Sequence, residues 1–317
     1  MVRDLLLRYS EISRNPSTSL CLVTRLLAAT PIIARYDRIA LLSRLLDTNS
    51  LAIDGNRTIN GFDSPSIEVL FVCAGKDFEL LQEAVNFAFL ASRSHDLIRV
   101  SLIVPDSDVD RARQIKLGPE SCIDVLPESK YLSAIQLEMI RDKFGDRSGW
   151  VIQQLLKVLH VSQSESPGVL VCDADTFLLR SRIWFDKDFN QILTPTWEFT
   201  QSYYDFLSKY GLVDLKPRYT FVSHHMLMQP HFMREARNFM SWENTDWMIQ
   251  DLIQFYDGSD QSPFSIDFEL YAQYLMKKHP DKVVLAKWAN KSFSRSLASP
   301  ANMIGLDFAS ISLHDYL

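Results

Sequence analysis

The sequence predicts an α/β fold: a mostly parallel mixed sheet flanked by helices, preceded by an N-terminal helical extension. Three observations lead to this prediction. Four apolar, strand-like runs alternate with helix-like segments between residues 67 and 180, which is typical of a parallel sheet. Residues 1–50 instead place leucine and isoleucine at helical spacing. The 317 residues, 47% of them hydrophobic, are enough to bury such a core.

The extension is predicted to span residues 1–60 and the α/β domain residues 61–317. Helical spacing in residues 1–50 is interrupted at Pro31, and residues 53–66 are rich in turn formers, which favours a linker. The first 50 residues hold seven arginines and four acids, so a basic segment precedes an acidic body in a chain of net charge −6. This balance disfavours nucleic-acid binding and stable membrane anchoring. We expect the extension to pack on the core or on a second subunit, which would give a homo-oligomer.

The elements of the α/β domain follow in order. Strands are predicted at residues 67–73, 99–106, 122–127 and 168–175, with helices at 77–92, 131–143 and 150–161. The run IEVLFVC is apolar at nearly every position, which favours a strand buried on both faces. After residue 180 we expect short strands near 191–195, 219–229, 282–288 and 307–314, and helices near 230–241, 246–256 and 266–278.

Several features bear on the location of the protein. The sequence has no apolar run of 18 residues and its start does not resemble a secretory signal, so we expect neither a spanning helix nor export. The cysteines form no CxxC pair and are expected to be reduced and buried: Cys21, Cys73, Cys122 and Cys172. We expect a cytoplasmic protein, with peripheral contact at the inner membrane face as an extension of that prediction.

The most informative residues are Asp173 and Asp175, which end an apolar strand in the string DAD. Ligands of open α/β sheets bind at the carboxyl ends of strands. Two carboxylates this close together repel unless a cation or proton intervenes. Mg²⁺ and Mn²⁺ take carboxylate oxygens together with substrate phosphate oxygens. The pair therefore predicts a metal site with a diphosphate ligand, and the alternative is an acidic turn after a strand.

Two enzyme classes use this string. Asp173, Asp175 and Thr176 resemble the DxDxT motif of haloacid-dehalogenase phosphatases, in which Asp173 would be the nucleophile. That motif starts the fold of those enzymes, whereas at least three strands precede it here, so the fit is local. GT-A glycosyltransferases instead place a DxD motif mid-chain, after several strands of a nucleotide-binding sheet, as this sequence does.

The resemblance to GT-A glycosyltransferases covers about residues 66–317. GWVIQQLLKV (149–158), VLVCDADTFL ending at Leu178, and SHHMLM (223–228) are similar, in this order, to motifs of a poorly characterised bacterial GT-A-like family. The resemblance implies a nucleotide-binding half over 67–180 and an acceptor half over 181–317. In such enzymes Asp175 would bind the metal, Asp173 the ribose or a metal-bound water, and His314 would be a further metal ligand.

One face of the predicted helix at 150–161 is polar. At 100° per residue the aliphatic side chains share one side, and the other side carries Trp150, Gln153, Gln154 and Lys157. Lys157 would meet a phosphate or carboxylate, and the two amides would bind a nucleotide or sugar. The alternative is an ordinary solvated face.

Other candidate donor contacts follow the first two strands. By the same resemblance Asp106 would contact the base or ribose, and Ala74 and Gly75 would leave room for the nucleotide. Lys291 and Arg295 would close over the diphosphate from a flexible loop, or form a solvated turn.

The acceptor site is expected in the second half of the chain. His224 and His225 are neighbours on a strand-like run and should point to opposite faces, and His224 is the candidate for the cleft. The rings of Trp197, Tyr203 and Tyr204 would stack on a sugar or belong to the core.

Asp267 and Glu269 start a predicted helix, and the resemblance to inverting GT-A enzymes implies that one of them is the general base. Acids in a first helical turn are also favoured by the helix dipole alone. If neither acts as a base, a retaining reaction remains open.

The sequence thus predicts a Mn²⁺- or Mg²⁺-dependent hexosyltransferase that uses a nucleotide sugar, with a UDP-sugar favoured. The acceptor would be a glycan or a lipid-linked glycan, in bacterial surface polysaccharide synthesis. The alternatives are a phosphatase that uses Asp173 and a GT-A-shaped binding protein without catalysis.

Overall fold

The computed structural model describes residues 65–92, 95, 97–115, 123–180, 182–185, 188–196, 199–213, 219–258, 263–286, 288, 290–295 and 309–314. The helices predicted for residues 1–50 lie outside this set, as do Cys21, Cys122 and Trp197. Among the described residues, no helix is both long enough and apolar enough to cross a membrane.

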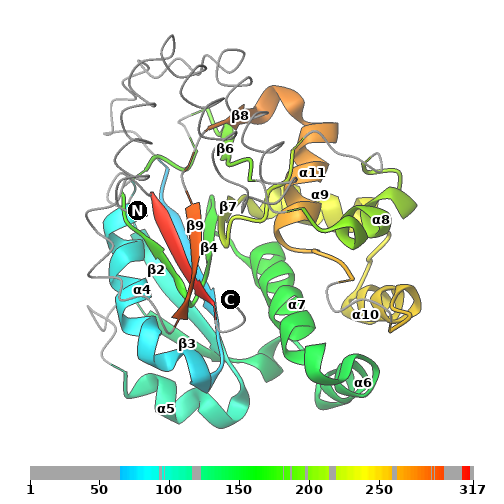
Figure 1. Cartoon of the computed structure of the whole chain (residues 1–317), viewed down its shortest axis with the longest axis horizontal. Helices are drawn as coiled ribbons and strands as arrows, with labels where there is room; N and C mark the ends of the chain where they lie inside the picture. The colour runs from blue at the N-terminus through cyan, green and yellow to red at the C-terminus, as the bar shows by residue number, and fades with distance from the viewer. Residues whose placement is uncertain are drawn as a thin grey trace, which may run out of the picture. The chain divides into compact units, whose positions relative to one another are not determined.

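The predicted α/β class is confirmed, with a central sheet of mostly parallel strands flanked by helices (Figure 1). The strand order is β3-β2-β1-β4-β7, and only β7 runs antiparallel to its neighbour. The five strands are β1 (Ile67–Val72), β2 (Leu97–Val104), β3 (Ile123–Pro127), β4 (Val169–Asp173) and β7 (His225–Met228).

Helices cover both faces of this sheet. Residues Val69 and Phe71 of β1 pack in one core cluster with α4 (Phe78–Ala91), and the short helix α5 (Val109–Arg113) lies on the same side. The alternate residues Leu70 and Val72 pack in a second cluster with α6 (Ala134–Phe144) and α7 (Ser148–Gln163). Because both faces of β1 are buried, an almost unbroken apolar run is the pattern that this strand requires.

Local signals fix the helices that follow β3. Ser133 and Gln136 form a capping box at the start of α6, in which each side chain accepts a hydrogen bond from the other residue's backbone N–H. Gly145 ends α6 with a φ of 50°, a left-handed conformation that glycine adopts without a steric penalty. A single turn of 3-10 helix then leads into α7.

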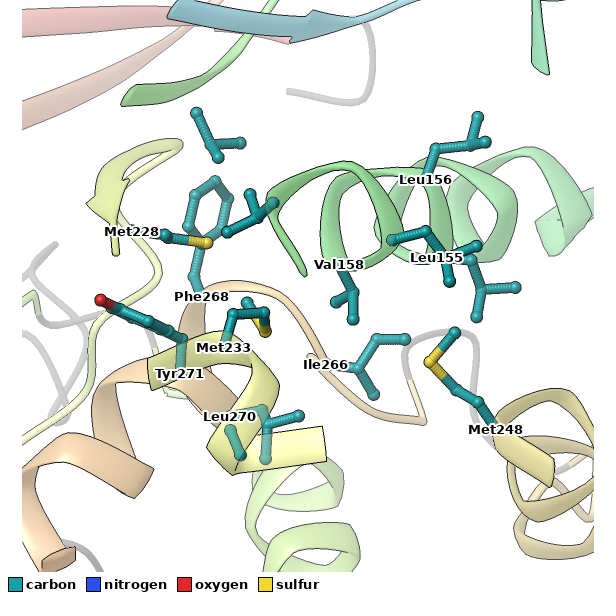
Figure 2. Close-up of a cluster of buried hydrophobic side chains, with 14 of the residues drawn as sticks. Leu155, Leu156, Val158, Met228, Met233, Met248, Ile266, Phe268, Leu270 and Tyr271 are labelled. Atoms are coloured by element: carbon teal, nitrogen blue, oxygen red, sulfur yellow. The ribbon is translucent and has the colours of Figure 1, made fainter. Parts of the chain in front are cut away.

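The second half of the domain packs on the far side of α7. Its helices are α8 (Gln201–Lys209), α9 (Pro230–Phe239), α10 (Thr245–Phe255) and α11 (Phe268–Lys278). Figure 2 shows Leu155 and Val158 of α7 in the cluster that Met233 of α9 and Leu270 of α11 complete. This shared core holds the start of α11 beside α7, and therefore near the carboxyl end of β4.

Two small sheets complete the fold. One has the order β5-β10-β9, and the other pairs β6 with β8 in parallel. Their strands are β5 (Thr176–Leu178), β6 (Gln191–Leu193), β8 (Val283–Leu285), β9 (Asn290–Ser294) and β10 (Ser310–His314). β10 runs antiparallel to β5, which follows the DAD string, so the C-terminal strand returns to the acidic strand end.

Most predicted elements of the α/β domain are present, but α5 and β5 were not predicted, and four further differences are found. β4 ends at Asp173 rather than at residue 175, because a turn separates it from β5. β7 covers only the end of the predicted strand at 219–229. α8 was not predicted, and the expected flexible loop or turn around Lys291 is wrong, because this segment is strand β9. Cys73 and Cys172 are buried free thiols, as predicted, and burial raises the pKa of both.

Candidate active site

The sheet reverses its winding between β1 and β4. From β1 the chain adds β2 and β3 on one side, and it then returns to place β4 on the other side of β1. Such a switch point leaves a crevice at the carboxyl ends of the two central strands, where α/β proteins bind their ligands. A cavity of about 760 Å³ lies there. Its lining includes the predicted residues Ala74, Trp150, Gln153, Gln154, Lys157, Asp173, Asp175, Tyr203, His224, Asp267 and His314.

Asp173 is the last residue of β4 and is held from two sides. Its Oδ1 lies 2.5 Å from Nζ of Lys157, and its Oδ2 lies 3.1 Å from Nδ1 of His224. Its backbone N–H donates to the carbonyl oxygen of His224 at 2.9 Å. Burial alone would raise the pKa of Asp173, but the Lys157 ammonium and the imidazole hold it well below its usual range. Asp173 is therefore an ionised, immobilised carboxylate.

Lys157 joins the two halves of the chain. Its ammonium lies between Asp173 and Oδ2 of Asp267, the latter at 3.1 Å, and its side chain is only 2% exposed. The ammonium also lies 4.7 Å from the centre of the Phe268 ring. Burial would lower the pKa of Lys157, but the two carboxylates raise it above its usual value. A permanently charged ammonium is thus buried at the base of the cavity.

Asp267 caps the start of α11. Its Oδ1 accepts hydrogen bonds from the N–H of Phe268 at 2.8 Å and from the hydroxyl of Ser265 at 3.1 Å. Its other oxygen faces Lys157, so the carboxylate is fixed at both oxygens. The capping role expected from the helix dipole and the placement in the cavity are therefore combined in one residue.

Asp175 and His314 form a second pair at the cavity. Oδ2 of Asp175 lies 3.0 Å from Nδ1 of His314, the last residue of β10. The backbone carbonyl of Asp175 accepts from the N–H of Leu313 at 2.9 Å, which fixes the two strands in register. The rings of His314 and His224 are 4.6 Å apart between centroids, so both predicted histidines lie at the acidic strand end.

Whether this cluster suits a metal depends on its ligands. The structure gathers no group of three or more potential His, Cys, Asp or Glu ligands among the residues it describes. Asp175 and His314 nevertheless lie as close as two ligands of one ion do. Mg²⁺ and Mn²⁺ commonly use one or two protein ligands and complete their shell with water and substrate phosphate. Asp175 and His314 therefore suit a cation shared with a diphosphate, and they do not form a closed protein cage.

The polar face predicted for α7 points into the cavity, as its lining shows. Gln153 donates from Nε2 to the carbonyl oxygen of Val72 at 3.1 Å, and Oε1 of Gln154 accepts from the N–H of Ile266 at 2.8 Å. Nε2 of Gln154 is buried and has no hydrogen-bond partner in the described part of the chain. An unsatisfied buried donor beside a cavity is a natural contact for a polar ligand. Gln154 and Lys157 are buried and Trp150 and Gln153 are half-buried, so this is not an ordinary solvated face.

Trp150 lies further along the same wall of the cavity. Its ring packs against those of Tyr203 and Phe264, at centroid distances of 6.4 and 5.7 Å, and the Arg147 guanidinium lies 4.7 Å from it. Tyr204, the neighbour of Tyr203, is fully buried and belongs to the core. Of the aromatic candidates that the structure describes, Trp150 and Tyr203 therefore reach the cavity.

Three predicted donor contacts are used elsewhere in the structure. Asp106 accepts from the N–H and the hydroxyl of Ser129, at 3.0 and 2.5 Å, and is not among the described residues that line the cavity. Gly75 does not leave open space, because a Cβ there would lie 2.6 Å from the guanidinium of Arg111. Arg295 lies 3.3 Å from both Asp77 and Glu79 at the start of α4, so it is engaged with acids at the cavity rim.

The second predicted base, Glu269, lies behind the cavity. Its side chain is fully buried and is not among the described lining residues. Burial raises its pKa to about 7, although hydrogen bonds from neighbouring groups oppose this shift. His225 points to the opposite face from His224 and packs between Trp184 and Trp288, and burial lowers its pKa to about 3.

The cavity also contains charged residues that the sequence did not single out. They are Lys76, Asp77, Glu128, Arg141, Asp146 and Arg147. Asp77 follows β1 at the start of α4, where an acid is expected for the helix dipole alone. The only signal for a ligand role was therefore its position after the first strand, which is shared by many acids without such a role.

Comparisons with known proteins give limited information. Residues 76–193 match the model of a family of unknown function, DUF6492. No curated protein matches. Among solved structures, the fold is similar to an active-site mutant of LgtC, with a TM-score of 0.47, and to the galactosyltransferase LgtC in complex with donor and acceptor sugar analogs, with a TM-score of 0.45. Each alignment has 13% identity and covers 78% of this chain and 86% of the other.

Proposed function

We propose that this chain is a GT-A-type glycosyltransferase that moves a hexose from a nucleotide sugar to a glycan or lipid-linked acceptor with the help of Mn²⁺ or Mg²⁺. One observation carries the proposal. The DAD string ends β4 at the switch point of the sheet, inside a large cavity, and Asp175 is in contact with His314 there. The motifs named above as resembling GT-A enzymes, GWVIQQLLKV, the DAD strand and SHHMLM, all contribute residues to this cavity.

The charges of the site support a cation. Six acids line the cavity (Asp77, Glu128, Asp146, Asp173, Asp175 and Asp267) and four cations (Lys76, Arg141, Arg147 and Lys157), of which Lys157 contacts two of the acids. The six acids and four cations leave a balance of −2 that a divalent ion would offset. Asp175 and His314 would hold the ion. When bound, it would neutralise the nucleoside diphosphate as that group leaves the sugar.

The residues of the chain divide the remaining work. Lys157 bridges Asp173 and Asp267 and fixes both carboxylates at the base of the cavity. Ala74 and Asp77, after β1, lie where the nucleotide would bind. The unpaired Nε2 of Gln154 would donate to a sugar or phosphate oxygen. We favour a UDP-sugar, as the GT-A resemblance does.

The acceptor side would be formed by His224 and Tyr203, which line the cavity from the second half of the chain. Of the two acids considered as general base, Asp267 lines the cavity and Glu269 does not. Asp267 is therefore the candidate for taking the proton of the acceptor hydroxyl in an inverting reaction. A role in bacterial surface polysaccharide synthesis would follow from the same resemblance.

The phosphatase alternative requires Asp173 to attack phosphorus. Both of its carboxylate oxygens are instead engaged, one by Lys157 and the other by His224. Attack by Asp173 would require one of these contacts to break, just as proton transfer to Asp267 would require the loss of one of its contacts. The position of the DAD string, after three strands of the sheet, favours the transferase over the phosphatase.

Thermal shift measurements with UDP, GDP and CMP, each with and without Mn²⁺, test the proposal. We expect one nucleotide to raise the melting temperature by about 5 °C at roughly 100 times its dissociation constant, only with Mn²⁺ present. Asp175→Asn should abolish this shift. The matched control is Asp110→Asn, which changes an exposed acid of α5 that forms an ion pair with Arg113 at 3.5 Å, away from the cavity. An absent shift for every nucleotide, with a phosphatase activity that Asp173→Asn removes, would overturn the proposal.

A further inference from the structure

Glu269 lies in the first turn of α11 and is surrounded by hydrogen-bond donors. The backbone N–H of Phe221 donates to its Oε1, and Nε2 of Gln273 donates to its Oε2 at 3.1 Å. The hydroxyl of Tyr204, from α8, also helps to lower the pKa of this carboxyl group. No Lys or Arg forms an ion pair with this carboxylate in the described part of the chain. Glu269 therefore holds neighbouring chain segments together and does not face a ligand.

The segment that Glu269 holds leads directly to the cavity. Gln273, which donates to Glu269, also donates to the backbone carbonyl of Tyr219 at 2.8 Å. Glu269 and Gln273 therefore bind the backbone at both ends of residues 219–221. On the other side of this segment, the carbonyl of Thr220 accepts from the N–H of Thr196 at 2.7 Å. Residues 219–221 are thus fixed from two directions.

His224 follows three residues later in a strained conformation. Its φ is 60°, in the left-handed region that residues other than glycine rarely adopt. Its carbonyl accepts from the N–H of Asp173, and its ring contacts the carboxylate of the same residue. Strained backbone persists at functional sites when the surrounding structure imposes it. Residues 219–221 are therefore held shortly before this residue, and the hydroxyl of Ser223 donates to the carbonyl of His225 at 2.5 Å beside it.

We propose that Glu269 is a positioning residue that fixes the backbone before His224 and thereby holds its imidazole against Asp173. Asp267, at the start of the same helix, contacts Lys157. The start of α11 would therefore position both partners of Asp173, Lys157 directly and His224 through the backbone before it. The inference rests on the proposed function only in that His224 contacts the acceptor.

Histidine NMR tests the inference without any assay of catalysis. In protein labelled with ¹³C at histidine Cε1, the His224 signal is identified by its loss in His224→Gln. Glu269→Ala should shift this signal, whereas Glu269→Gln should restore it, because an amide oxygen still accepts the Phe221 N–H. The matched control is Tyr274→Phe, which removes a different hydrogen bond of α11, at 3.2 Å to Glu235 of α9. It should leave the His224 signal in place.

If Glu269→Ala does not fold, Gln273→Met removes the donor to Oε2 of the same carboxyl group and the contact with the Tyr219 carbonyl, and it should move the His224 signal in the same direction. With an active preparation, Glu269→Ala should lower kcat/KM about 10- to 100-fold, as expected when a site group is displaced. A His224 signal that is unchanged in both variants would overturn the inference. Absence of transferase activity in the wild type would instead contradict the proposed function, and the NMR result would stand apart from it.

Discussion

Lys157 offers the strongest test of how the site is built. Its ammonium is 2.5 Å from Asp173 and 3.1 Å from Asp267, with 2% of the side chain exposed. At an effective dielectric constant of 20, charges about 3 Å apart attract by about 5 kcal/mol, and desolvation of the ammonium offsets part of this. Removing one member of a buried ion pair costs about 3–5 kcal/mol, because the partner charge stays buried. We expect Lys157→Met to lower the free energy of unfolding by about this amount at pH 7.

Urea denaturation of the wild type and Lys157→Met measures this loss, with Lys209→Met as the control. Lys209 makes a comparable contact, 3.0 Å to Asp251, but 44% of its side chain is exposed, so its removal should cost no more than about 1 kcal/mol. Equal losses in the two variants would refute the reasoning.

The pH dependence of Lys157→Met has a definite sign. The pKa of Asp173 is depressed in the folded wild type, so its contribution to stability is present above its unfolded value of 3.8 and is lost as the pH falls below that value. Without Lys157 this depression is largely removed, and protonation of Asp173 relieves the buried charge. The stability difference between wild type and variant should therefore narrow from pH 7 to pH 4. A difference that grows over this range would contradict the account.

Two buried glutamates predict pH dependences of stability that have opposite signs. The pKa of Glu269 is raised from 4.5 to about 7, so the free energy of unfolding of the wild type should fall by about 3 kcal/mol as the pH rises from about 4.5 to 7. Glu269→Gln should remove this fall, which urea midpoints taken at pH 5 and pH 8 would measure. Glu68 is fully buried in contact with His160, Ser101 and Ser164, and despite its burial these partners lower its pKa. Glu68→Gln should therefore cost about 3 kcal/mol at pH 7 and less below pH 4. If the stability of the two variants, relative to the wild type, changes with pH in the same direction, the pKa shifts given for Glu269 and Glu68 would both be wrong.

The α/β core could be predicted because its sequence patterns are local. The run IEVLFV of β1 is apolar except at Glu68, and the structure buries both faces of this strand. The polar stripe of α7 could likewise be placed beside the carboxyl end of β4, because helical geometry alone puts Gln153 and Lys157 on one side. These predictions needed only the periodicity of the chain.

The elements that the sequence missed depend on distant partners. β9 has five residues, and it is a strand because β10 pairs with it along its full length. Arg295, expected over a diphosphate, contacts Asp77, which precedes it by 218 residues. Such contacts leave no periodic signal in the surrounding sequence, so tertiary packing decides the outcome.

The candidate site likewise contains residues that local patterns predict and residues whose roles depend on tertiary packing. Asp173, Asp175 and Lys157 could be predicted together, because strand ends at a switch point converge whatever the details of the loops. The acidic pair at the start of α11 could not be resolved from sequence. Asp267 lines the cavity, whereas Glu269, two residues later, binds the backbone of Phe221, 48 residues away. Which of two such acids faces the ligand depends on how the helix is rotated in the core.

The most direct test of the central claim is a crystal structure of the protein soaked with UDP and Mn²⁺, with anomalous scattering to locate the manganese. The account predicts one manganese ion bonded to Asp175 and His314, with the diphosphate completing its shell and the uracil on the side of Ala74. UDP bound in the cavity without manganese, or manganese bound away from Asp175, would contradict it.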